Sequence, residues 1–300
     1  MTTERAAGAV TVANLLEELA RELNVAGIAK PFSEAREIVS ALYDAPRFWP
    51  LLNGAVAVDS ETLARARRGV ERRSRGAPLA YAVGRANFRH LTLDVDERVL
   101  IPRPETEQLV DVVLEVCARD GTPGVAMDVG TGSGAIALAL SAEGDGRFSR
   151  VYGTDISCDA LSVARRNAER CASALKTPVD FLHGSLLSPV RDIRARVVVS
   201  NPPYIALSEA AALPASVRDW EPAVALYSGA DGMSATARLV REAADVLAPG
   251  GWLAMEVDVR RASLVAELVS RERRFQAVRV ELDLTGRERF VLARRQEMEG

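Results

Sequence analysis

A polar segment that directly follows an apolar stretch has the composition of a small nitrogen-binding clamp. Residues 197–200 (VVVS) run into Asn201, Pro202, Pro203 and Tyr204. Each proline fixes its own φ and donates no backbone hydrogen bond, and a residue that precedes a proline is driven towards extended geometry. The segment therefore holds its carbonyl oxygens and one side-chain amide rigidly, beside an aromatic ring.

Methyl transfer to an –NH2 group is the chemistry that this segment would suit. A nitrogen conjugated to a carbonyl group or a ring is a poor nucleophile, because its lone pair is delocalised. The side-chain oxygen of Asn201 and the carbonyl of Pro202 would accept the two N–H bonds, while Tyr204 packs on the flat group. Holding both reactants at near-attack distance then supplies most of the catalysis without a strong base. The alternative is a rigid turn with no chemical role.

A glycine-rich segment upstream has the composition of a nucleoside-binding loop. It joins an expected strand (125–129) to an expected helix and contains Gly130, Thr131, Gly132, Ser133 and Gly134. Glycines let a backbone turn tightly and approach a ligand closely, and the helix behind the loop presents free N–H groups. The GxGxG spacing favours S-adenosylmethionine over a dinucleotide, because no pyrophosphate has to be cradled.

Asp155 strengthens the interpretation of this loop. It ends the next expected strand (151–155), where a carboxylate can accept hydrogen bonds from two ribose hydroxyls. The alternative is that Asp155 only caps a helix or stabilises a turn. Because ligands of doubly wound sheets lie beyond the carboxyl ends of the strands, we expect the glycine loop and Asn201 to face one crevice.

The composition excludes several classes of protein. The chain has 300 residues, of which 48% are hydrophobic and 26% charged, and its net charge is −3. Its three cysteines form no CxxC pair and its two histidines lie at no ligand spacing, so we expect a reducing, cytoplasmic location and no metal. We also expect no membrane span, no secretory signal and no stable nucleic-acid binding.

The N-terminal part of the chain is predicted to be a helical bundle over residues 1–80. Apolar residues recur at helical spacing in two stretches, namely Val12, Leu15, Leu16, Leu19 and Leu23, then Ala35, Ile38, Val39 and Leu42. Residues 61–89 contain eight arginines and two glutamates, a net charge of +6. This basic segment is either a solvated helix face or a surface that docks a partner.

The rest of the chain is predicted to be an α/β domain (102–300), reached through a β-hairpin connection (81–101). In the connection, alternating apolar residues end in a turn at 96–98 that leads into a second strand at 99–101. Strands and helices then alternate, which indicates a mostly parallel sheet with helices on both faces. One of these helices (about 234–247) is expected to end at Pro249-Gly250-Gly251, before a strand at 252–257. The last two strands (278–282 and 290–293) are close enough in sequence to form an antiparallel edge.

These motifs resemble a known family of enzymes. The segments DVGTGSGAIALAL, TDIS, VVVSNPPYI and APGGWLAMEV resemble a class I S-adenosylmethionine-dependent methyltransferase that methylates amino groups. PLAYAVGRANF (78–88), VLIPRPETEQLV (99–110), VRDWEPAVALYSGADGM (217–233) and DLTGRERFVLARR (283–295) resemble the HemK/PrmC family. Its members are protein-(glutamine-N5) methyltransferases of class I peptide-chain release factors.

The resemblance implies a seven-stranded Rossmann-like sheet, a small helical domain that grips the release factor, and methylation of the glutamine in its Gly-Gly-Gln loop. It implies that residues 130–134, Asp155, Leu186 and Asn201 bind the cofactor. Asn201, Pro202, Pro203 and Tyr204 would hold the glutamine amide, with Asn201 and Pro202 as the catalytic pair. Arg103 and Glu105, flanked by Pro102 and Pro104, would line the mouth of the site, unless this segment is only a linker.

Several positions depart from the family pattern. Ser185 stands where an acidic residue is usual, and Leu186 stands where the residue is often aromatic. Asp258 replaces a usual glycine, and Arg89 with His90 replaces an aromatic and a small residue. Two other functions remain open from the sequence: methylation of an amino group on a nucleic-acid base, with residues 61–89 as the backbone-binding face, and a non-catalytic binding protein that keeps the fold.

Overall fold

A computed structural model describes residues 10–118 and 123–297 of the chain. The chain divides into two compact units. The first takes in the chain up to Arg85 together with Ala215–Trp220, and the second takes in Ala86–Pro214 and the chain from Glu221 onward.

The first unit is helical. Its helices are α1 (Val12–Val25), α2 (Pro31–Leu42), α3 (Trp49–Leu52), α4 (Ser60–Ser74), α5 (Leu79–Val83) and α9 (Ala215–Arg218). The side chains of Thr11 and Asp59 accept backbone N–H groups and so cap α1 and α4. The apolar stripe predicted for the first helix is confirmed, because all five of its residues are buried; in the second stripe only Leu42 is partly exposed.

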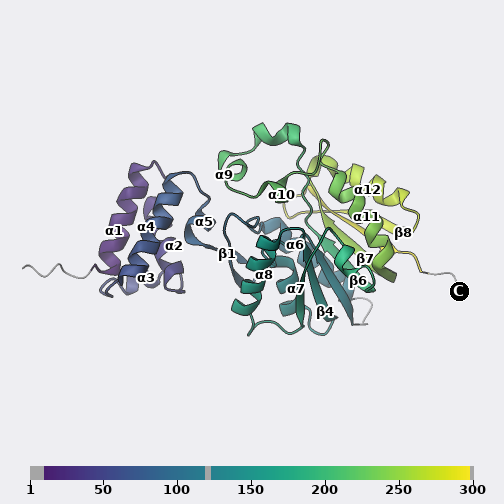
Figure 1. The fold of residues 1–300 in the computed structure, drawn as a ribbon, viewed down its shortest axis with the longest axis horizontal. Helices are drawn as coiled ribbons and strands as arrows, with labels where there is room; N and C mark the ends of the chain where they lie inside the picture. Colours follow the sequence, from purple (N-terminus) through teal and green to yellow (C-terminus); the bar gives the residue numbers. More distant parts are fainter. Residues whose placement is uncertain (1–9, 119–122, 298–300) are drawn as a thin grey trace, which may run out of the picture. The chain divides into compact units, whose positions relative to one another are not determined.

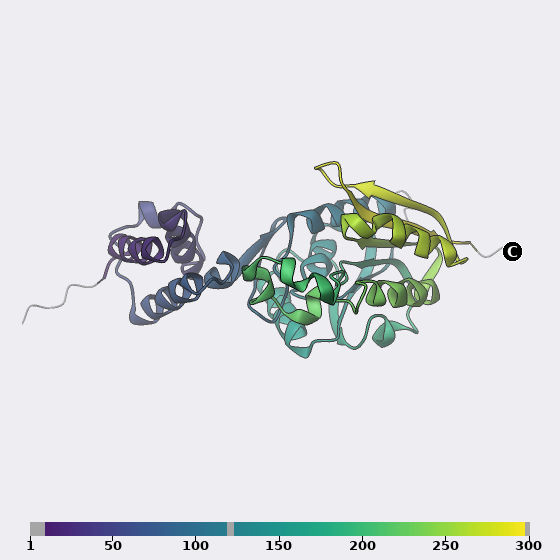
Figure 2. The ribbon, with the colours of Figure 1, turned by 90° about the horizontal axis from the view of Figure 1, so that it is seen from above.

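The second unit is built around a seven-stranded sheet of order β5-β4-β3-β6-β7-β9-β8. Its strands are β3 (Gly124–Val129), β4 (Phe148–Asp155), β5 (Val179–His183), β6 (Ala195–Ser200), β7 (Leu247–Glu256), β8 (Phe275–Leu282) and β9 (Glu288–Arg295). All pairs up to β7 are parallel, and β9 runs antiparallel to both β7 and β8. The predicted α/β fold and its antiparallel edge, yellow in Figure 2, are confirmed.

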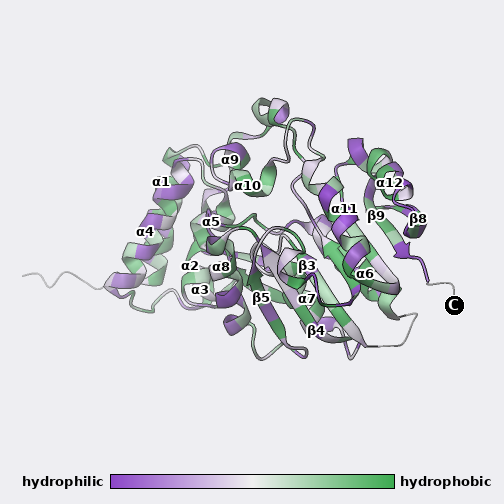
Figure 3. Ribbon diagram, turned by 45° about the vertical axis from the view of Figure 1, so that its right-hand side comes forward, coloured by the Kyte–Doolittle hydropathy of each residue, from purple (hydrophilic) through white to green (hydrophobic). Residues whose placement is uncertain are grey.

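Helices cover both faces of this sheet (Figure 1). They are α6 (Pro104–Ala118), α7 (Ala135–Glu143), α8 (Cys158–Arg170), α11 (Ser234–Val246) and α12 (Ala262–Arg271). The second unit also contains the short helix α10 (Ala223–Leu226) and 3₁₀ turns at Ser188–Val190, Leu207–Ala212 and Val259–Arg261. Figure 3 shows α7 mainly in the hydrophobic colour, whereas α4 of the first unit carries hydrophilic bands. All seven residues of α7 from Ala135 to Ser141 are buried, as expected of a helix beside the centre of the sheet.

Alternation along the strands divides the core into two layers. Ala126, Val197, Val199, Ala254 and Leu292 share one core with α6, α7 and α8. The residues between them in sequence, including Met127, Val198, Leu253, Met255 and Val291, share the other core with α11 and α12. This division follows from the two-residue period of a strand, which points successive side chains to opposite faces.

The predicted hairpin was wrong in its turn and second strand. β1 (Arg85–Phe88) pairs with β2 (Leu91–Asp94), so the turn lies at Arg89 and His90, and residues 96–101 form no strand. The backbone of Asp94 is instead bound by the side chain of Asn167 on α8, whose Oδ1 accepts its N–H at 2.7 Å and whose Nδ2 donates to its carbonyl at 3.0 Å. The alternation of apolar and polar residues predicted which side chains of this segment are buried, but it did not predict which strand the segment pairs with.

The predicted start of the strand at residue 252 was also misplaced, whereas the end of the preceding helix was predicted to within one residue. Helix α11 ends at Val246 and β7 begins at Leu247, five residues before the expected strand start. Ala195 pairs with Leu247 while Val197 pairs with Trp252, so residues 248–251 bulge out of the ladder. Gly250 adopts φ +77°, which explains why this bulge contains glycine.

Candidate active site

The site lies where the strand order of the sheet reverses. From β3 the chain moves outward through β4 and β5 and then returns to β6 on the other side of β3. In such sheets ligands bind beyond the carboxyl ends of the strands at this reversal. The glycine loop follows β3 and Asn201 follows β6, and Ser200 Oγ donates to the carbonyl of Val129 at 2.7 Å, which joins the two strand ends.

Hydrogen bonds to β4 and to Asp128 fix the glycine loop. The N–H groups of Gly130 and Thr131 both donate to the carbonyl of Thr154, at 2.8 and 2.9 Å. Asp128 Oδ2 accepts from Thr131 Oγ1 at 2.6 Å and from the N–H of Ala137 at 3.1 Å. Asp128 is fully buried, and this burial raises its pKa to about 7.

The carboxylate of Asp155 faces the loop. Its Oδ2 accepts the N–H of Gly132 and its Oδ1 accepts the N–H of Ser157, both at 2.9 Å. Ser157, rather than Asp155, is the N-cap of α8. Burial raises the pKa of Asp155. Asp155 therefore stabilises the turn after β4 while its carboxylate remains at the edge of a hollow.

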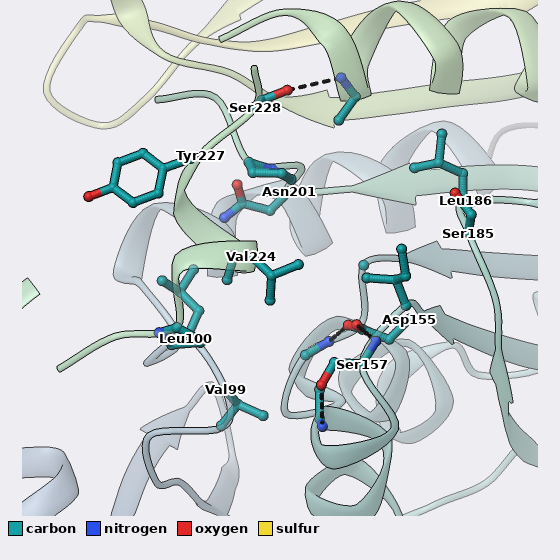
Figure 4. A pocket seen from close by; sticks show the side chains of 18 of the residues that line it. Val99, Leu100, Asp155, Ser157, Ser185, Leu186, Asn201, Val224, Tyr227 and Ser228 are labelled. Atoms are coloured by element: carbon teal, nitrogen blue, oxygen red, sulfur yellow. Dashed lines mark hydrogen bonds between the residues drawn. The ribbon is translucent and has the colours of Figure 1, made fainter. Parts of the chain in front are cut away.

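A hollow of about 360 Å³ joins these elements (Figure 4). Gly130 and Gly132 of the glycine loop line it together with Asp155 and Leu186. Asn201, the residue that follows β6, lines it as well, and Figure 4 shows its side chain apart from that of Asp155. The remaining wall is mostly apolar and comes from residues including Val99, Leu100, Ile156, Pro222, Val224, Ala225 and Tyr227. The hollow thus places an acid and a glycine loop on one side and a side-chain amide on the other.

Six of the predicted site residues line this hollow and six do not. The lining residues are Gly130, Gly132, Asp155, Leu186, Asn201 and Pro203. Thr131 and Ser133 are buried behind the loop. Gly134, at φ +84°, packs so closely that an added Cβ would lie 3.2 to 3.3 Å from Phe181, Ala164 and Leu138. Pro202, Tyr204 and Arg103 lie outside its lining, although two of them adjoin lining residues in the chain.

Two of the positions that depart from the family pattern line the hollow, whereas Asp258, Arg89 and His90 do not. Ser185 and Leu186 both line it, so no carboxylate stands at position 185. Leu186 adopts φ +50°, and its carbonyl accepts a hydrogen bond from Thr154 Oγ1 at 2.8 Å. The backbone of this apolar wall is therefore tied to β4 next to Asp155.

Behind Asn201, two buried residues form a hydrogen-bonded chain. Asn201 Nδ2 donates to Thr106 Oγ1 at 3.1 Å, and Thr106 Oγ1 donates to Glu256 Oε2 at 2.7 Å. Burial raises the pKa of Glu256 to about 7. Burial and the nearby Glu256 also raise the pKa of Tyr204, to about 12, so its hydroxyl stays protonated at neutral pH.

Arg103 is held by a buried acid. Its Nη2 lies 2.5 Å from Glu221 Oε1, and Glu221 Oε2 accepts the N–H of Ile101 at 3.4 Å. The side chain of Glu221 is only 1% exposed. This contact ties the segment around Arg103 to the segment that precedes α10.

Thr106, Glu221 and Glu256 were missed as site residues. All three fall inside the sequence segments that indicated the family, at 99–110, 217–233 and 248–257. An acidic residue at the end of an apolar strand, as at Glu256, was the signal that could have been used, because a buried carboxylate is costly without a role. Among the described residues no group of three acidic, His or Cys side chains could hold a metal ion, and no helix there is long and apolar enough to span a membrane.

Family models match both units of the chain. A model described as "Methyltransferase small domain" matches residues 106–214, and one described as "PrmC N-terminal domain" matches residues 14–84. The catalytic domain of hMettl16, in complex with an RNA hairpin, covers 83% of this chain and 86% of its own with a TM-score of 0.54. At 16% identity, that likeness shows the fold alone. Sheet order, glycine loop and family model together define a class I methyltransferase.

Two curated relatives narrow this class. The release factor glutamine methyltransferase of Deinococcus radiodurans is 41% identical over 94% of this chain and 98% of its own length. That of Moorella thermoacetica is 37% identical over 96% of this chain and 100% of its own length. The chain belongs to the family of release factor glutamine methyltransferases.

Proposed function

We propose that this enzyme transfers a methyl group from S-adenosylmethionine to the side-chain amide nitrogen of the glutamine in the Gly-Gly-Gln loop of class I peptide-chain release factors. One observation carries the proposal: Asn201 lines the same hollow as Gly130, Gly132 and Asp155. This arrangement supports a cofactor subsite and an amide acceptor within one cavity. The names of the relatives favour this function over methylation of a nucleic-acid base.

The residues of the hollow fit the cofactor. An added Cβ on Gly130 or Gly132 would meet no atom within 4 Å, so the loop backbone is open on this side. Asp155 supplies a carboxylate for the ribose hydroxyls, and the apolar wall that contains Ile156 and Leu186 suits a flat adenine ring. Bound S-adenosylmethionine would supply a methyl group on a positively charged sulfur.

The chain's own task is to orient the substrate nitrogen. Asn201 Oδ1 and the carbonyl of Pro202 accept the two N–H bonds of the glutamine amide, which turns the lone pair toward the methyl group. Proline at 202 and 203 keeps these acceptors fixed. Tyr204, whose hydroxyl is protonated, packs on the amide plane. The nitrogen can lose its extra proton to water after the methyl group is attached, so no buried base is required.

Several segments outside the hollow are proposed to bind the release factor. Arg103 and Glu105, with the flanking prolines 102 and 104, line the mouth of the site. The helical first unit recognises the release factor, and the +6 segment at 61–89 contributes to that recognition. Because release factors act at the ribosome, a cytoplasmic location belongs to the same proposal.

One labelling experiment tests this function. The enzyme is given methyl-labelled S-adenosylmethionine together with release factor, tRNA and duplex DNA in parallel. Label on the release factor is expected, and it is expected to disappear when the glutamine of the Gly-Gly-Gln loop is replaced by alanine. Label on nucleic acid alone would overturn the proposal, and cofactor binding without any label would indicate a non-catalytic protein.

A further inference from the structure

Glu256 is a buried carboxylate for which the proposed transfer reaction has no use. It ends β7, is 2% exposed, and has no ion-pair partner within 4 Å among the residues that the structure describes. Arg103 and Arg289 act on it only at longer range. Removing a carboxylate from water is costly, so a carboxylate kept in this environment calls for an explanation.

Sheet register places Glu256 beside Asn201. β6 and β7 are adjacent parallel strands in which Ser200 pairs with Met255. Asn201 and Glu256 are therefore the next residues of two neighbouring strands, both at the carboxyl edge where the hollow opens. Thr106, in the first turn of α6, completes the contact between them and is 5% exposed.

The hydroxyl of Thr106 determines which end of the Asn201 amide can face it. A hydroxyl has one proton, and Thr106 Oγ1 donates that proton to Glu256 Oε2 at 2.7 Å. Toward Asn201, the same oxygen can then only accept. The Nδ2 end of Asn201 satisfies it at 3.1 Å, whereas the Oδ1 end would set two acceptors against each other.

This orientation leaves Asn201 Oδ1 directed away from Thr106 and available to the substrate. A flipped Asn201 would instead present its –NH2 to the –NH2 of the substrate, donor against donor. We propose that Thr106 and Glu256 are positioning residues that hold the Asn201 amide with Oδ1 toward the reacting nitrogen. This inference rests on the proposed function for its kinetic consequence, although the hydrogen-bonded chain exists without substrate.

Kinetics of matched variants provide the first test. Thr106→Val keeps the shape of the side chain and removes the hydroxyl, and we expect kcat for release-factor methylation to fall about 10- to 100-fold. The KM for release factor and the Kd for S-adenosylmethionine should change less than about threefold. Thr106→Ser restores the hydroxyl and should recover most of the turnover. The kcat of Glu256→Gln should lie between those of Thr106→Val and Thr106→Ser, because the new amide can either accept a hydrogen bond from Thr106 or donate one to it.

A control variant separates this effect from general loss of a buried hydroxyl. Thr177 is also buried, and its Oγ1 donates to the carbonyl of Phe148 at 3.4 Å, away from the lining of the hollow. Thr177→Val should leave kcat within about twofold of the parent enzyme. Equal losses of kcat in Thr177→Val and Thr106→Val, or in Thr106→Ser and Thr106→Val, would overturn the proposal.

A spectroscopic experiment tests the hydrogen bonds between Asn201, Thr106 and Glu256 without any substrate. In nitrogen-15 spectra of the full-length protein, the side-chain –NH2 signals of Asn201 are identified by their loss in Asn201→Asp. One of the two protons should be protected from exchange with water, and Thr106→Val and Glu256→Gln should each shift the signals and reduce this protection. Unchanged signals would overturn the proposal. If the parent enzyme failed to methylate release factor, the proposed function would be wrong. The spectra would still show whether Thr106 and Glu256 orient the Asn201 amide.

Discussion

At the scale of single residues, two buried acidic side chains, Asp128 and Glu256, hold the two sides of the hollow in place. Burial raises the pKa of Asp128 and of Glu256 to about 7 in each case. Asp128 secures the glycine loop through Thr131 and the N–H of Ala137. Glu256 secures Asn201 through Thr106. One buried acid thus fixes the glycine loop, and the other fixes the side of the hollow that contains Asn201.

Asp128 gives the stability of the protein a defined dependence on pH. Its pKa is about 7 in the folded chain against 3.8 ordinarily, so the folded state retains a proton that the unfolded chain releases. Its contribution is complete below pH 4 and is lost as the pH rises to about 7. Asp128→Asn removes this dependence, so the stability of the variant relative to the parent should increase over that window by on the order of 3 kcal/mol.

Urea unfolding at several pH values between 4 and 8 measures this difference. Glu256→Gln serves as a comparison, because it removes a group whose pKa is raised in the same direction at another place. Parallel curves of unfolding free energy against pH for the parent and Asp128→Asn would show that Asp128 titrates normally in the folded protein.

The residues that could be predicted from the sequence were those with a local signature. Asn201 to Tyr204 and the glycine loop could be singled out because each is a continuous segment of the chain. Thr106 has no such signature, and the position of Glu256 at the end of an apolar strand does not reveal its link to Asn201, because that link depends on β6 lying beside β7 and on α6 packing against both. These three elements are separated in sequence by many tens of residues.

At the scale of elements, the turn between β3 and α7 has glycines with two different tasks. Gly132 has φ +55° and open space where a Cβ would be, whereas Gly134 has φ +84° and is packed against three side chains. The sequence pattern predicted the same cofactor-binding role for both glycines. Only the packing around the loop distinguishes Gly132, which has open space beside it, from Gly134, which permits close packing.

Alanine at these two positions should therefore give different losses. Gly134→Ala should lower the free energy of unfolding by about 2 to 4 kcal/mol, because it combines backbone strain with overpacking. Gly132→Ala should lower it by only about 1 kcal/mol but weaken cofactor binding more strongly, because its Cβ enters the open side of the loop. Thermal unfolding and calorimetric titration with S-adenosylmethionine measure the two quantities. The reverse ranking would contradict these assignments.

The elements themselves were largely predictable, since helical and strand periods are properties of short segments. The helices of the first unit and the strands of the sheet follow their apolar patterns. The errors fall at the hairpin and at the start of β7. At both places a side chain or a glycine bulge, rather than periodicity, determines where the backbone pairs.

At the scale of the whole molecule, the basic helix α4 is a candidate surface for binding the release factor. Arg67 pairs with Glu18 and Arg73 with Glu34. Arg65 and Arg68 are exposed and have no ion-pair partner among the described residues. Unpaired exposed arginines are consistent either with a solvated face or with the partner-docking surface of the proposed function.

The double variant Arg65→Glu/Arg68→Glu separates these two interpretations. If α4 docks the release factor, the KM for that protein should rise about 5- to 30-fold at low salt, and less at high salt, because exposed charges are screened. The Kd for S-adenosylmethionine should not change. Arg271→Glu, at an exposed arginine of α12, is the matched control and should leave both constants unchanged. An unchanged KM in the double variant would leave α4 as a solvated face.

The proposed function requires Asn201 to bind the nitrogen that becomes methylated. The most direct test replaces it by alanine and measures two quantities on the same preparation: methyl transfer to the release factor and the Kd for S-adenosylmethionine. We predict that transfer falls by at least about a thousandfold, while the Kd changes by less than about fivefold because the glycine loop and Asp155 remain. Transfer within about tenfold of the parent enzyme, from a folded variant that binds the cofactor, would contradict the account.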